Sequence, residues 1–175
     1  MQKKSMYELE RLNSEAFKQI KKTPLVLLLD NVRSALNVGS AFRTADAFAL
    51  HSIALCGISA QPPHREILKT ALGADQTVDW IYFANTIAAV QYYREHGYQI
   101  CAVEQAEGSI LLQNFVWSEK PICIIFGNEV DGVSDEVMNI SDACIEIPQF
   151  GTKHSLNISV SMGIVIWELF RKLKL

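Results

Sequence analysis

The sequence is poor in the features that mark several protein classes. Its 175 residues include only 9 Gly and 5 Pro, too few for a collagen-like chain. The longest apolar runs, such as Leu25–Leu29 and Ile122–Phe126, are far shorter than the roughly 20 residues of a membrane-spanning helix. Met1–Lys22 is polar and basic, without the apolar segment of a secretory signal peptide. We therefore expect a cytoplasmic protein that does not cross a membrane.

Cysteine and histidine are also sparse, and both are scattered. The four cysteines, at positions 56, 101, 123 and 144, stand singly and form no CxxC pair. We interpret them as buried, reduced thiols rather than as disulfides or metal ligands. The four histidines, at positions 51, 64, 96 and 154, lack the spacing of a ligand set, so the sequence predicts no metal site.

The net charge of −3 hides an uneven distribution. Residues 1–23 hold six basic and three acidic residues, and residues 168–175 hold three basic residues and one acidic residue, whereas the segment between them is acidic. Basic ends on an acidic body are able to bring cations together on one face, where they would meet phosphates. The alternative is a pair of solvated helices with ordinary surface lysines.

The apolar pattern predicts an α/β fold. A helical period over residues 5–22 stops before Pro24. Beyond it, short apolar runs alternate with helical segments, which predicts strands buried on both faces of a mostly parallel six-stranded sheet. The predicted strands are Leu25–Leu29, Ser52–Cys56, Val78–Phe83, Gln99–Val103, Ile122–Phe126 and Ala143–Ile147. The predicted helices are Val38–Phe48, Arg65–Ala71, Thr86–His96, Asp135–Ile140 and Leu156–Leu173. We expect one domain over residues 24–175 after a basic helical extension over residues 1–23.

Ligands of parallel α/β sheets bind beyond the carboxyl ends of the strands, where three loops stand out. In the first, residues 30–43, Asn37 fits a helix N-cap and Arg43 follows about two turns later. An Arg near a helix start is suited to bind a phosphate or a carboxylate. The alternative is an Arg that pairs with Asp46 on its own helix.

The second and third loops carry glycine and small polar residues. Residues 127–134 hold two glycines around Glu129, which is able to accept hydrogen bonds from a neighbouring loop or from Arg. The sequence has neither a GxxxxGK[ST] phosphate loop nor a GxGxxG dinucleotide motif, so ATP, GTP and NAD are poorly supported. Residues 148–157 end in Ser155, which fits the N-cap of the last helix, and Asn157, among small side chains that leave room for a ligand.

Together the three loops resemble the SpoU/TrmH branch of the SPOUT methyltransferases. The family's first motif, N-x-G-x-x-x-R-[ST]-A-x-A, is matched by Asn37, Gly39, Arg43, Thr44, Ala45 and Ala47. Its second motif, F-G-x-E-x-x-G, is matched by Phe126, Gly127, Glu129 and Gly132. Its third, I-P-x-x-G-x-x-x-S-L-N-x-S-x, is matched by Ile147, Pro148, Gly151, Ser155, Leu156, Asn157 and Ser159. The motifs occur in the family's order and spacing, and the resemblance covers roughly residues 24–173.

The resemblance implies transfer of a methyl group from S-adenosylmethionine to a ribose 2′-hydroxyl of tRNA or rRNA. It also implies the SPOUT fold, with a deep C-terminal trefoil knot, and a homodimer with the last helix at the interface. The chain departs from many relatives at Leu36, where they carry His, and at Ala49, where they often carry Gly. Many relatives also carry an additional N-terminal RNA-binding domain.

Family roles carried over by position predict the site residues. Arg43 would bind the phosphate beside the target ribose and stabilise the developing alkoxide, because Arg is too basic to act as a general base. Asn37 and Glu129 would orient Arg43, and Ser155 and Asn157 would fix the ribose or the opposing subunit. The expected donor contacts are Val103, Gly127, Ile147 and Leu156. The expected RNA contacts besides Arg43 are Lys18, Lys21, Lys22, Lys69 and His154, with further candidates at Arg171, Lys172 and Lys174.

Two alternative functions use the same fold. One is a catalytically silent RNA-binding or assembly protein, against which the intact Arg43, Glu129 and Asn157 argue. The other is an enzyme that methylates a base nitrogen, against which the pair of Asn37 and Arg43 argues. The motifs are more similar to those of relatives that act on the tRNA D-loop or on large-subunit rRNA than to those of the anticodon-wobble enzymes.

Overall fold

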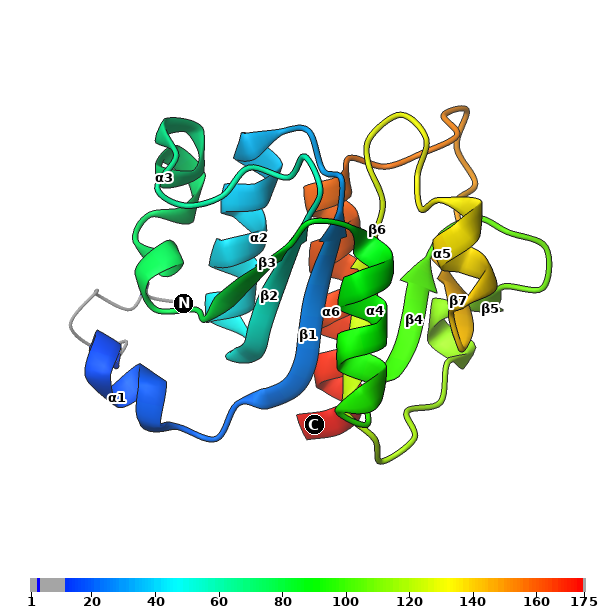
Figure 1. Ribbon diagram of the computed structural model, residues 1–175. Helices are drawn as coiled ribbons and strands as arrows, with labels where there is room; N and C mark the ends of the chain where they lie inside the picture. The colour runs from blue at the N-terminus through cyan, green and yellow to red at the C-terminus, as the bar shows by residue number, and fades with distance from the viewer. Residues whose placement is uncertain (1–2, 4–11, 175) are drawn as a thin grey trace.

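The protein is an α/β domain built on one parallel sheet, seen in a computed structural model that describes residue 3 and residues 12–174 (Figure 1). The seven strands follow the order β3-β2-β1-β6-β4-β7-β5. Every neighbouring pair in this sheet is parallel, so the strands share one carboxyl edge. The strands are β1 (Thr23–Asp30), β2 (Leu50–Cys56), β3 (Trp80–Phe83), β4 (Gln99–Val103), β5 (Ile110–Leu111), β6 (Ile122–Phe126) and β7 (Ala143–Glu146).

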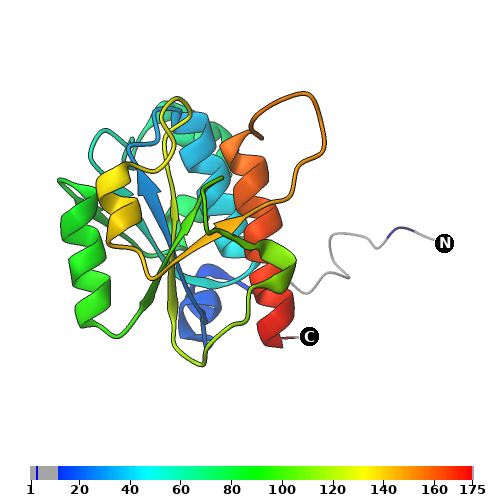
Figure 2. The same cartoon turned by 90° about the vertical axis from the view of Figure 1, so that its right-hand side faces the viewer.

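Helices lie on both faces of the sheet and give the domain three layers (Figure 2). α4 and α5 cover one face, and α2 and α6 cover the other. The helices are α1 (Ser14–Gln19), α2 (Ala35–Ala47), α3 (Arg65–Ala71), α4 (Thr86–Glu95), α5 (Asp135–Asn139) and α6 (Ile158–Lys174), with short 3₁₀ turns η2 (Ala74–Gln76) and η3 (Leu112–Asn114).

Alternate residues of β1 belong to the two halves of the core. Leu25, Leu27 and Leu29 pack on the α2 and α6 side, and Val26 and Leu28 pack on the α4 side. All five side chains are fully buried, so each contributes about 1.5–3 kcal/mol of hydrophobic stabilisation. The strand is continuously apolar because a strand between two helical layers has no solvent face.

The sequence predicted the fold class and most element bounds. α3, β4 and β6 have the predicted bounds. The six predicted strands become seven, because β5 consists of only two residues, both exposed, which is too short an apolar run to predict a strand. α1 covers only part of the helix predicted over residues 5–22, and the part of that prediction in residues 4–11 lies outside the described residues. The trefoil knot stays a prediction.

Two predicted helix caps were wrong. α2 is capped by Ser34, whose hydroxyl oxygen accepts from the backbone N–H of Asn37 at 3.3 Å. α6 begins after Asn157, whose side-chain oxygen accepts from the backbone N–H of Ser159 at 2.9 Å, whereas Ser155 lies two residues earlier. Both stretches offer several good capping residues, and the path of the preceding loop decides which one is used. The first correction leaves the side chain of Asn37 free for a contact outside the helix.

The turn between α2 and β2 holds Ala49 in the left-handed conformation, with φ of 48°. Its backbone N–H donates to the Asp46 carbonyl at 3.0 Å, and its carbonyl accepts from the N–H of Thr23 at 2.8 Å. These bonds fix the turn, and a Cβ is strained there. A glycine at this position would avoid the strain.

The four cysteines are free thiols. Three lie buried in the sheet, and Cys144 is half-buried. Burial raises the pKa of Cys56 and of Cys101 to about 12, so neither is a reactive thiolate. Among residues 12–174, no helix has the length and apolar character needed to cross a bilayer. The same part of the chain holds no cluster of three or more His, Cys, Asp or Glu suited to a metal.

Candidate active site

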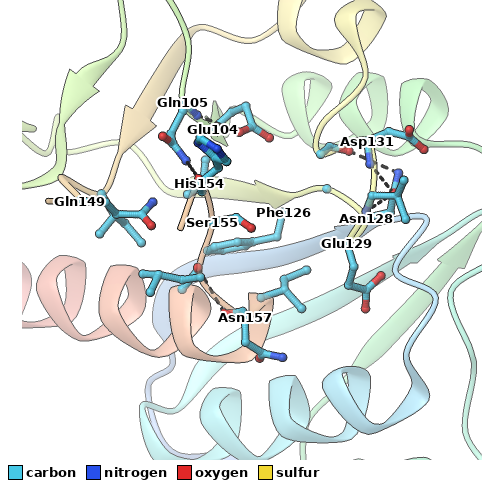
Figure 3. Close-up of a pocket in the computed structure, with 18 residues that line it drawn as sticks. Glu104, Gln105, Phe126, Asn128, Glu129, Asp131, Gln149, His154, Ser155 and Asn157 are labelled. Atoms are coloured by element: carbon cyan, nitrogen blue, oxygen red, sulfur yellow. Dashed lines mark hydrogen bonds between the residues drawn. The ribbon is translucent and has the colours of Figure 1, made fainter. Parts of the chain in front are cut away.

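A cavity of about 510 Å³ opens at the carboxyl edge of the sheet (Figure 3). The loops after β4, β6 and β7 and the start of α6 form its walls. Its size is that of a small-molecule site. Three acidic residues line it, namely Glu104, Glu129 and Asp131, and we call it the carboxylate cavity.

Most predicted donor and catalytic residues from the second and third motifs line the carboxylate cavity. They are Val103, Gly127, Glu129, Ile147, His154, Ser155, Leu156 and Asn157. The remaining predicted site residues lie outside its walls, and they are Asn37, Arg43, Lys18, Lys21, Lys22 and Lys69. Within one chain, the candidate site therefore has two separate parts.

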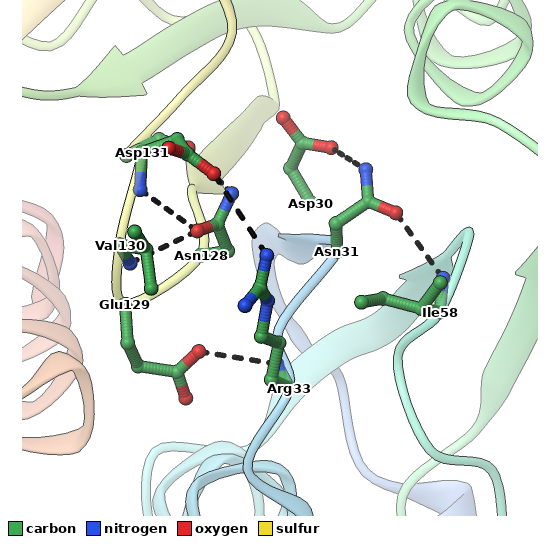
Figure 4. A network of polar contacts seen from close by, with 9 residues as sticks. Asp30, Asn31, Arg33, Ile58, Asn128, Glu129, Val130 and Asp131 are labelled. Atoms are coloured by element: carbon green, nitrogen blue, oxygen red, sulfur yellow. Dashed lines mark hydrogen bonds and ion pairs between the residues drawn. The ribbon is translucent and has the colours of Figure 1, made fainter.

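Glu129 connects the carboxylate cavity to the start of α2 (Figure 4). Its carboxylate accepts hydrogen bonds from the backbone N–H groups of Arg33 at 3.1 Å and Ser34 at 3.2 Å, and from the side-chain amide of Asn37 at 2.9 Å. Burial raises the pKa of the Glu129 carboxyl, but hydrogen bonds from Asn37, its own backbone, Arg33 and Ser34 outweigh burial and hold the pKa below its ordinary value. The ionised Glu129 carboxylate therefore links the second motif loop to the first by hydrogen bonds.

Arg43 is not part of this hydrogen-bond network. Asn37 and Glu129 bond to each other, and within residues 12–174 neither hydrogen-bonds to Arg43. The alternative partner of Arg43 is also occupied elsewhere, because Asp46 accepts from the Thr77 hydroxyl at 2.6 Å. Among the described residues, the exposed Arg43 forms neither an ion pair nor a hydrogen bond. The expectation that Asn37 and Glu129 orient Arg43 does not hold within one chain.

Arg43 lines a second cavity of about 520 Å³, which lies between α2, α3 and α6. Its lining consists of Ser40, Arg43, Thr44, Ala47, Phe48, Lys69, Thr70 and Gly163. We call it the Arg43 cavity. Both charged residues in this lining are basic, so the cavity favours an anion, although Lys69 also pairs with Glu66 at 2.5 Å.

Two motif glycines allow close approaches of the backbone. A Cβ at Gly39 would lie 2.1 Å from the hydroxyl of Thr70, so this glycine lets α3 pack tightly on α2 beside the Arg43 cavity. A Cβ at Gly127 would lie 1.9 Å from the carbonyl carbon of Gly132. The loop after β6 therefore folds back on itself. The side-chain oxygen of Asn128 closes it by accepting from the backbone N–H groups of Val130 at 2.9 Å and Asp131 at 2.8 Å, as Figure 4 shows.

The N-terminal lysines lie at the amino edge of the sheet, on the opposite side from the carboxylate cavity (Figure 1). Lys22 donates to the carbonyl of Phe17 at 2.6 Å, and its ammonium lies 3.2 Å from the centre of the Phe17 ring. Lys22 is thus part of the fold, whereas Lys18 and Lys21 are exposed. Within one chain, none of the three flanks the carboxylate cavity.

The basic residues near the end of α6 are largely occupied. Lys172 donates to three carbonyl oxygens at 2.6–3.1 Å, those of Leu112, Gln113 and Phe115. An ammonium has three donors, so the expectation that Lys172 contacts RNA was wrong. Arg171 pairs with Glu168 at 2.8 Å. The side chain of Lys174 lies outside the described residues.

Sequence reasoning missed Glu104 and Gln105, which follow β4 and line the carboxylate cavity. The Glu104 carboxylate accepts from the backbone N–H groups of Gln105 at 2.8 Å and Val133 at 3.3 Å. The Gln105 side chain donates to the His154 carbonyl and so ties the β4 loop to the loop before α6. The signal that could have found them is their position just beyond the carboxyl end of a central strand.

The carboxylate cavity is suited to a cationic ligand with an apolar part. No Lys or Arg of residues 12–174 belongs to its lining, which disfavours a ligand rich in phosphate. Its carboxylates favour a positive charge. Apolar side chains from the strand ends and the last loop, including Phe126, Ile147 and Leu156, offer a surface for a ring.

Comparison with models of known protein families identifies the family of this domain. The model of the SpoU rRNA Methylase family matches residues 24–167. The chain belongs to this family. The match runs from β1 through most of α6, so both cavities lie inside the SpoU domain.

Similar proteins of the SpoU family are named as RNA methyltransferases. The chain is 32% identical over 161 residues to an uncharacterized tRNA/rRNA methyltransferase of Borreliella burgdorferi, covering 92% of this chain and 69% of that protein. It is 29% identical over 163 residues to the 23S rRNA (guanosine-2′-O-)-methyltransferase RlmB of Neisseria meningitidis, covering 90% of this chain and 62% of that protein.

A solved structure shows the same fold. The AdoMet-bound rRNA methyltransferase of Sinorhizobium meliloti has a TM-score of 0.81 and 30% identity, over 91% of this chain and 60% of that one. This likeness confirms the predicted SPOUT-type α/β fold. The chain spans about 60% of the length of this protein and of the Neisseria relative.

Proposed function

We propose that this protein transfers a methyl group from S-adenosylmethionine to a ribose 2′-hydroxyl of tRNA or rRNA. The observation that carries the proposal is the meeting of the three motif loops: the second and third line the carboxylate cavity, and Glu129 ties them to the first. The names of relatives, which include a 23S rRNA and a tRNA 2′-O-methyltransferase, support the same reaction.

The carboxylate cavity is the proposed donor site, because its lining fits S-adenosylmethionine. The donor supplies an electrophilic methyl group on a positively charged sulfur, and the cavity offers carboxylates without a Lys or Arg in the described lining. Val103, Ile147 and Leu156 would pack against the adenine ring. Backbone groups at Gly127 would hold the donor in place.

Arg43 is the proposed residue on the acceptor side. Its guanidinium would fork onto the phosphate beside the target ribose and stabilise negative charge on the attacking oxygen. Ser155 and Asn157 would position the ribose from the carboxylate cavity. Asn37 would act as a positioning residue through Glu129. The target ribose would then lie between the two cavities.

We also propose a homodimer with α6 at the interface. Val160, Ile164 and Trp167 of this helix are 49%, 38% and 46% exposed and follow a helical spacing. A second copy would cover this apolar stripe. Light scattering at micromolar concentration should give twice the 19.6 kDa mass of one chain. A stable monomer with full activity would contradict the dimer.

The N-terminal residues are assigned a supporting role. We propose that residues 1–23 form a basic extension of the methyltransferase domain in residues 24–175 and that the protein acts in the cytoplasm. Lys18, Lys21 and His154 are proposed RNA contacts in addition to Arg43.

Methyl transfer in vitro tests the proposed function. The protein is incubated with labelled S-adenosylmethionine and total RNA from cells that lack the gene, and the RNA is digested to nucleosides. The proposal predicts label in 2′-O-methylated nucleosides. Label in a methylated base would favour the base-methylating alternative. Binding of the donor without transfer to any RNA would favour the catalytically silent RNA-binding protein.

A further inference from the structure

One acidic side chain of the carboxylate cavity keeps unused hydrogen-bonding capacity. Glu104 is fixed at the end of β4, because its backbone N–H donates to the Ile145 carbonyl of β7 at 3.1 Å. Its carboxylate accepts one hydrogen bond from Gln105 at 2.8 Å and one from Val133 at 3.3 Å. A carboxylate has about four acceptor positions, so about two remain. They belong to a half-buried side chain that lines the cavity (Figure 3).

The other two carboxylates of the cavity are placed differently. Glu129 already accepts three hydrogen bonds from the loop before α2 and from Asn37. The side chain of Asp131 is 70% exposed and faces Arg33 at 4.0 Å (Figure 4). Of the three carboxylates, Glu104 is therefore the one that is held in place and still has capacity for a ligand.

The second motif leaves space for the Glu104 carboxylate. A Cβ at Gly132 would lie 2.2 Å from Glu104 Oε2, and Gly132 has φ of +68°. A side chain at this position would both strain the turn and displace the carboxylate. The motif glycine thus closes the loop after β6 and keeps Glu104 at the cavity wall.

We propose that Glu104 binds the two adjacent hydroxyls of the donor's ribose and makes the cavity selective for ribonucleosides. The inference rests on the proposed function, and it names the residue that selects the donor. Two adjacent hydroxyls are able to donate to the two oxygens of one carboxylate. In dinucleotide-binding folds, an acidic side chain accepts a hydrogen bond from the ribose 2′-hydroxyl.

Calorimetric binding of two ligands tests this role without turnover. The ligands are S-adenosylhomocysteine and its analogue that lacks both ribose hydroxyls. The wild-type protein should bind the ribose ligand about 10- to 100-fold more tightly, as expected for hydrogen bonds to a charged group. Glu104→Ala should bring the two affinities within about threefold of each other, and Glu104→Gln, which keeps the size of the side chain, should lose most of the preference.

The ratio of the two affinities separates ligand recognition from a supporting role. If Glu104 only tied the loops together, its loss would weaken both ligands equally and leave the ratio unchanged. Asp131→Asn is the matched control, because it removes a carboxylate from the same cavity and should keep the wild-type ratio. A wild-type ratio near one, or an unchanged ratio in Glu104→Ala, overturns the inference. A wild-type protein that binds neither ligand overturns the proposed function instead.

Discussion

Two cavities of similar size lie beside the first half of α6, and their charges are opposite. The carboxylate cavity is lined by three acidic residues and, within residues 12–174, by no Lys or Arg. The Arg43 cavity is lined by Arg43 and Lys69 and, in the same part of the chain, by no acidic residue. α6 contributes Ser161 to the first and Gly163 to the second.

The difference between the cavities matches the charges of the proposed reactants. The donor carries a positive sulfur, and the RNA acceptor carries phosphates. In an in-line transfer, the attacking oxygen approaches the methyl group from the side opposite the sulfur. The enzyme must therefore hold the donor and the RNA in a fixed relative orientation. If the carboxylate cavity holds the donor and the Arg43 cavity faces the RNA, this division would supply that orientation without any residue that binds both reactants.

The largest expected effect comes from removing the charge of the Arg43 cavity. Arg43→Ala should slow single-turnover methyl transfer by about 10²- to 10³-fold, the usual loss for one preorganised donor to a developing oxyanion. Donor affinity, measured by calorimetry, should stay nearly unchanged, because Arg43 lies outside the carboxylate cavity. Arg43→Lys should restore little, because an ammonium cannot reproduce the planar fork.

Two results would contradict the proposed separation of a donor cavity from an acceptor cavity. Transfer by Arg43→Ala within a few-fold of wild type would show that Arg43 has no role in chemistry. A collapse of donor affinity in the same variant would show that Arg43 supports the donor site, and the separation of the two cavities would be withdrawn.

Weakening the hydrogen bonds between Glu129 and the start of α2 should have a smaller effect. Glu129→Gln removes a charged acceptor from three hydrogen bonds at an exposed position, so we expect a loss of about 1 kcal/mol in the free energy of unfolding at pH 7. The folded-state pKa of Glu129 lies below its ordinary value, so this stabilisation is present above the unfolded-state pKa and disappears as the pH falls through the folded-state pKa.

Urea unfolding at pH 7 and at acidic pH checks the sign. The difference between wild type and Glu129→Gln should shrink as the pH falls below about 4. Asp131→Asn, at the rim of the same cavity, should change stability little at either pH. If the difference in the free energy of unfolding grew on acidification, Glu129 would not be an ionised residue that links the two loops.

The sequence predicted the grouping of residues around the carboxylate cavity better than the surroundings of Arg43. Motif residues such as Gly127 and Leu156 follow strands of a parallel sheet, and the common carboxyl edge brings them together without further information. Arg43 and Asn37 lie on the same helix, and a spacing of six residues already turns their side chains about 120° apart. What the spacing could not show is which groups surround Arg43, because these depend on how α2 packs against α3 and α6. Glu104 was missed because no motif marks it.

The same limit applies to the fold. Continuous apolar runs revealed β1, β4 and β6, whereas β5 has only two residues, which are apolar but exposed and too few to indicate a strand. The role of Lys172 was also hidden, because the carbonyls that it binds lie about 60 residues earlier in the chain.

A third prediction concerns the amino edge of the sheet, which lies opposite the carboxylate cavity. If Lys18 and Lys21 contact RNA phosphates, changing both to Gln should weaken all RNAs alike and lower the salt slope of binding by about 0.7–0.9 per lysine. Lys120→Gln, an exposed lysine before β6, is the control for a general loss of charge. A salt slope equal to that of wild type would restrict RNA binding to the region around the two cavities.

The smallest expected effect is at the turn after α2. Ala49→Gly relieves a left-handed alanine but adds freedom to the unfolded chain, so we expect a net stabilisation of about 0.5 kcal/mol. Ala88→Gly, at an exposed position in the first turn of α4, should destabilise by about 0.5 kcal/mol. Urea unfolding of both variants checks the opposite signs, and destabilisation by Ala49→Gly would show that the turn is not strained.

Hydrogen–deuterium exchange with each reactant tests the division of the site most directly. S-adenosylmethionine should protect the loops after β4, β6 and β7, around residues 103–105, 127–133 and 147–157, and should leave residues 40–47 of α2 unchanged. RNA without the donor should protect α2 and α3 beside Arg43. Protection of α2 by the donor, or donor binding that leaves the three loops unprotected, would contradict the account.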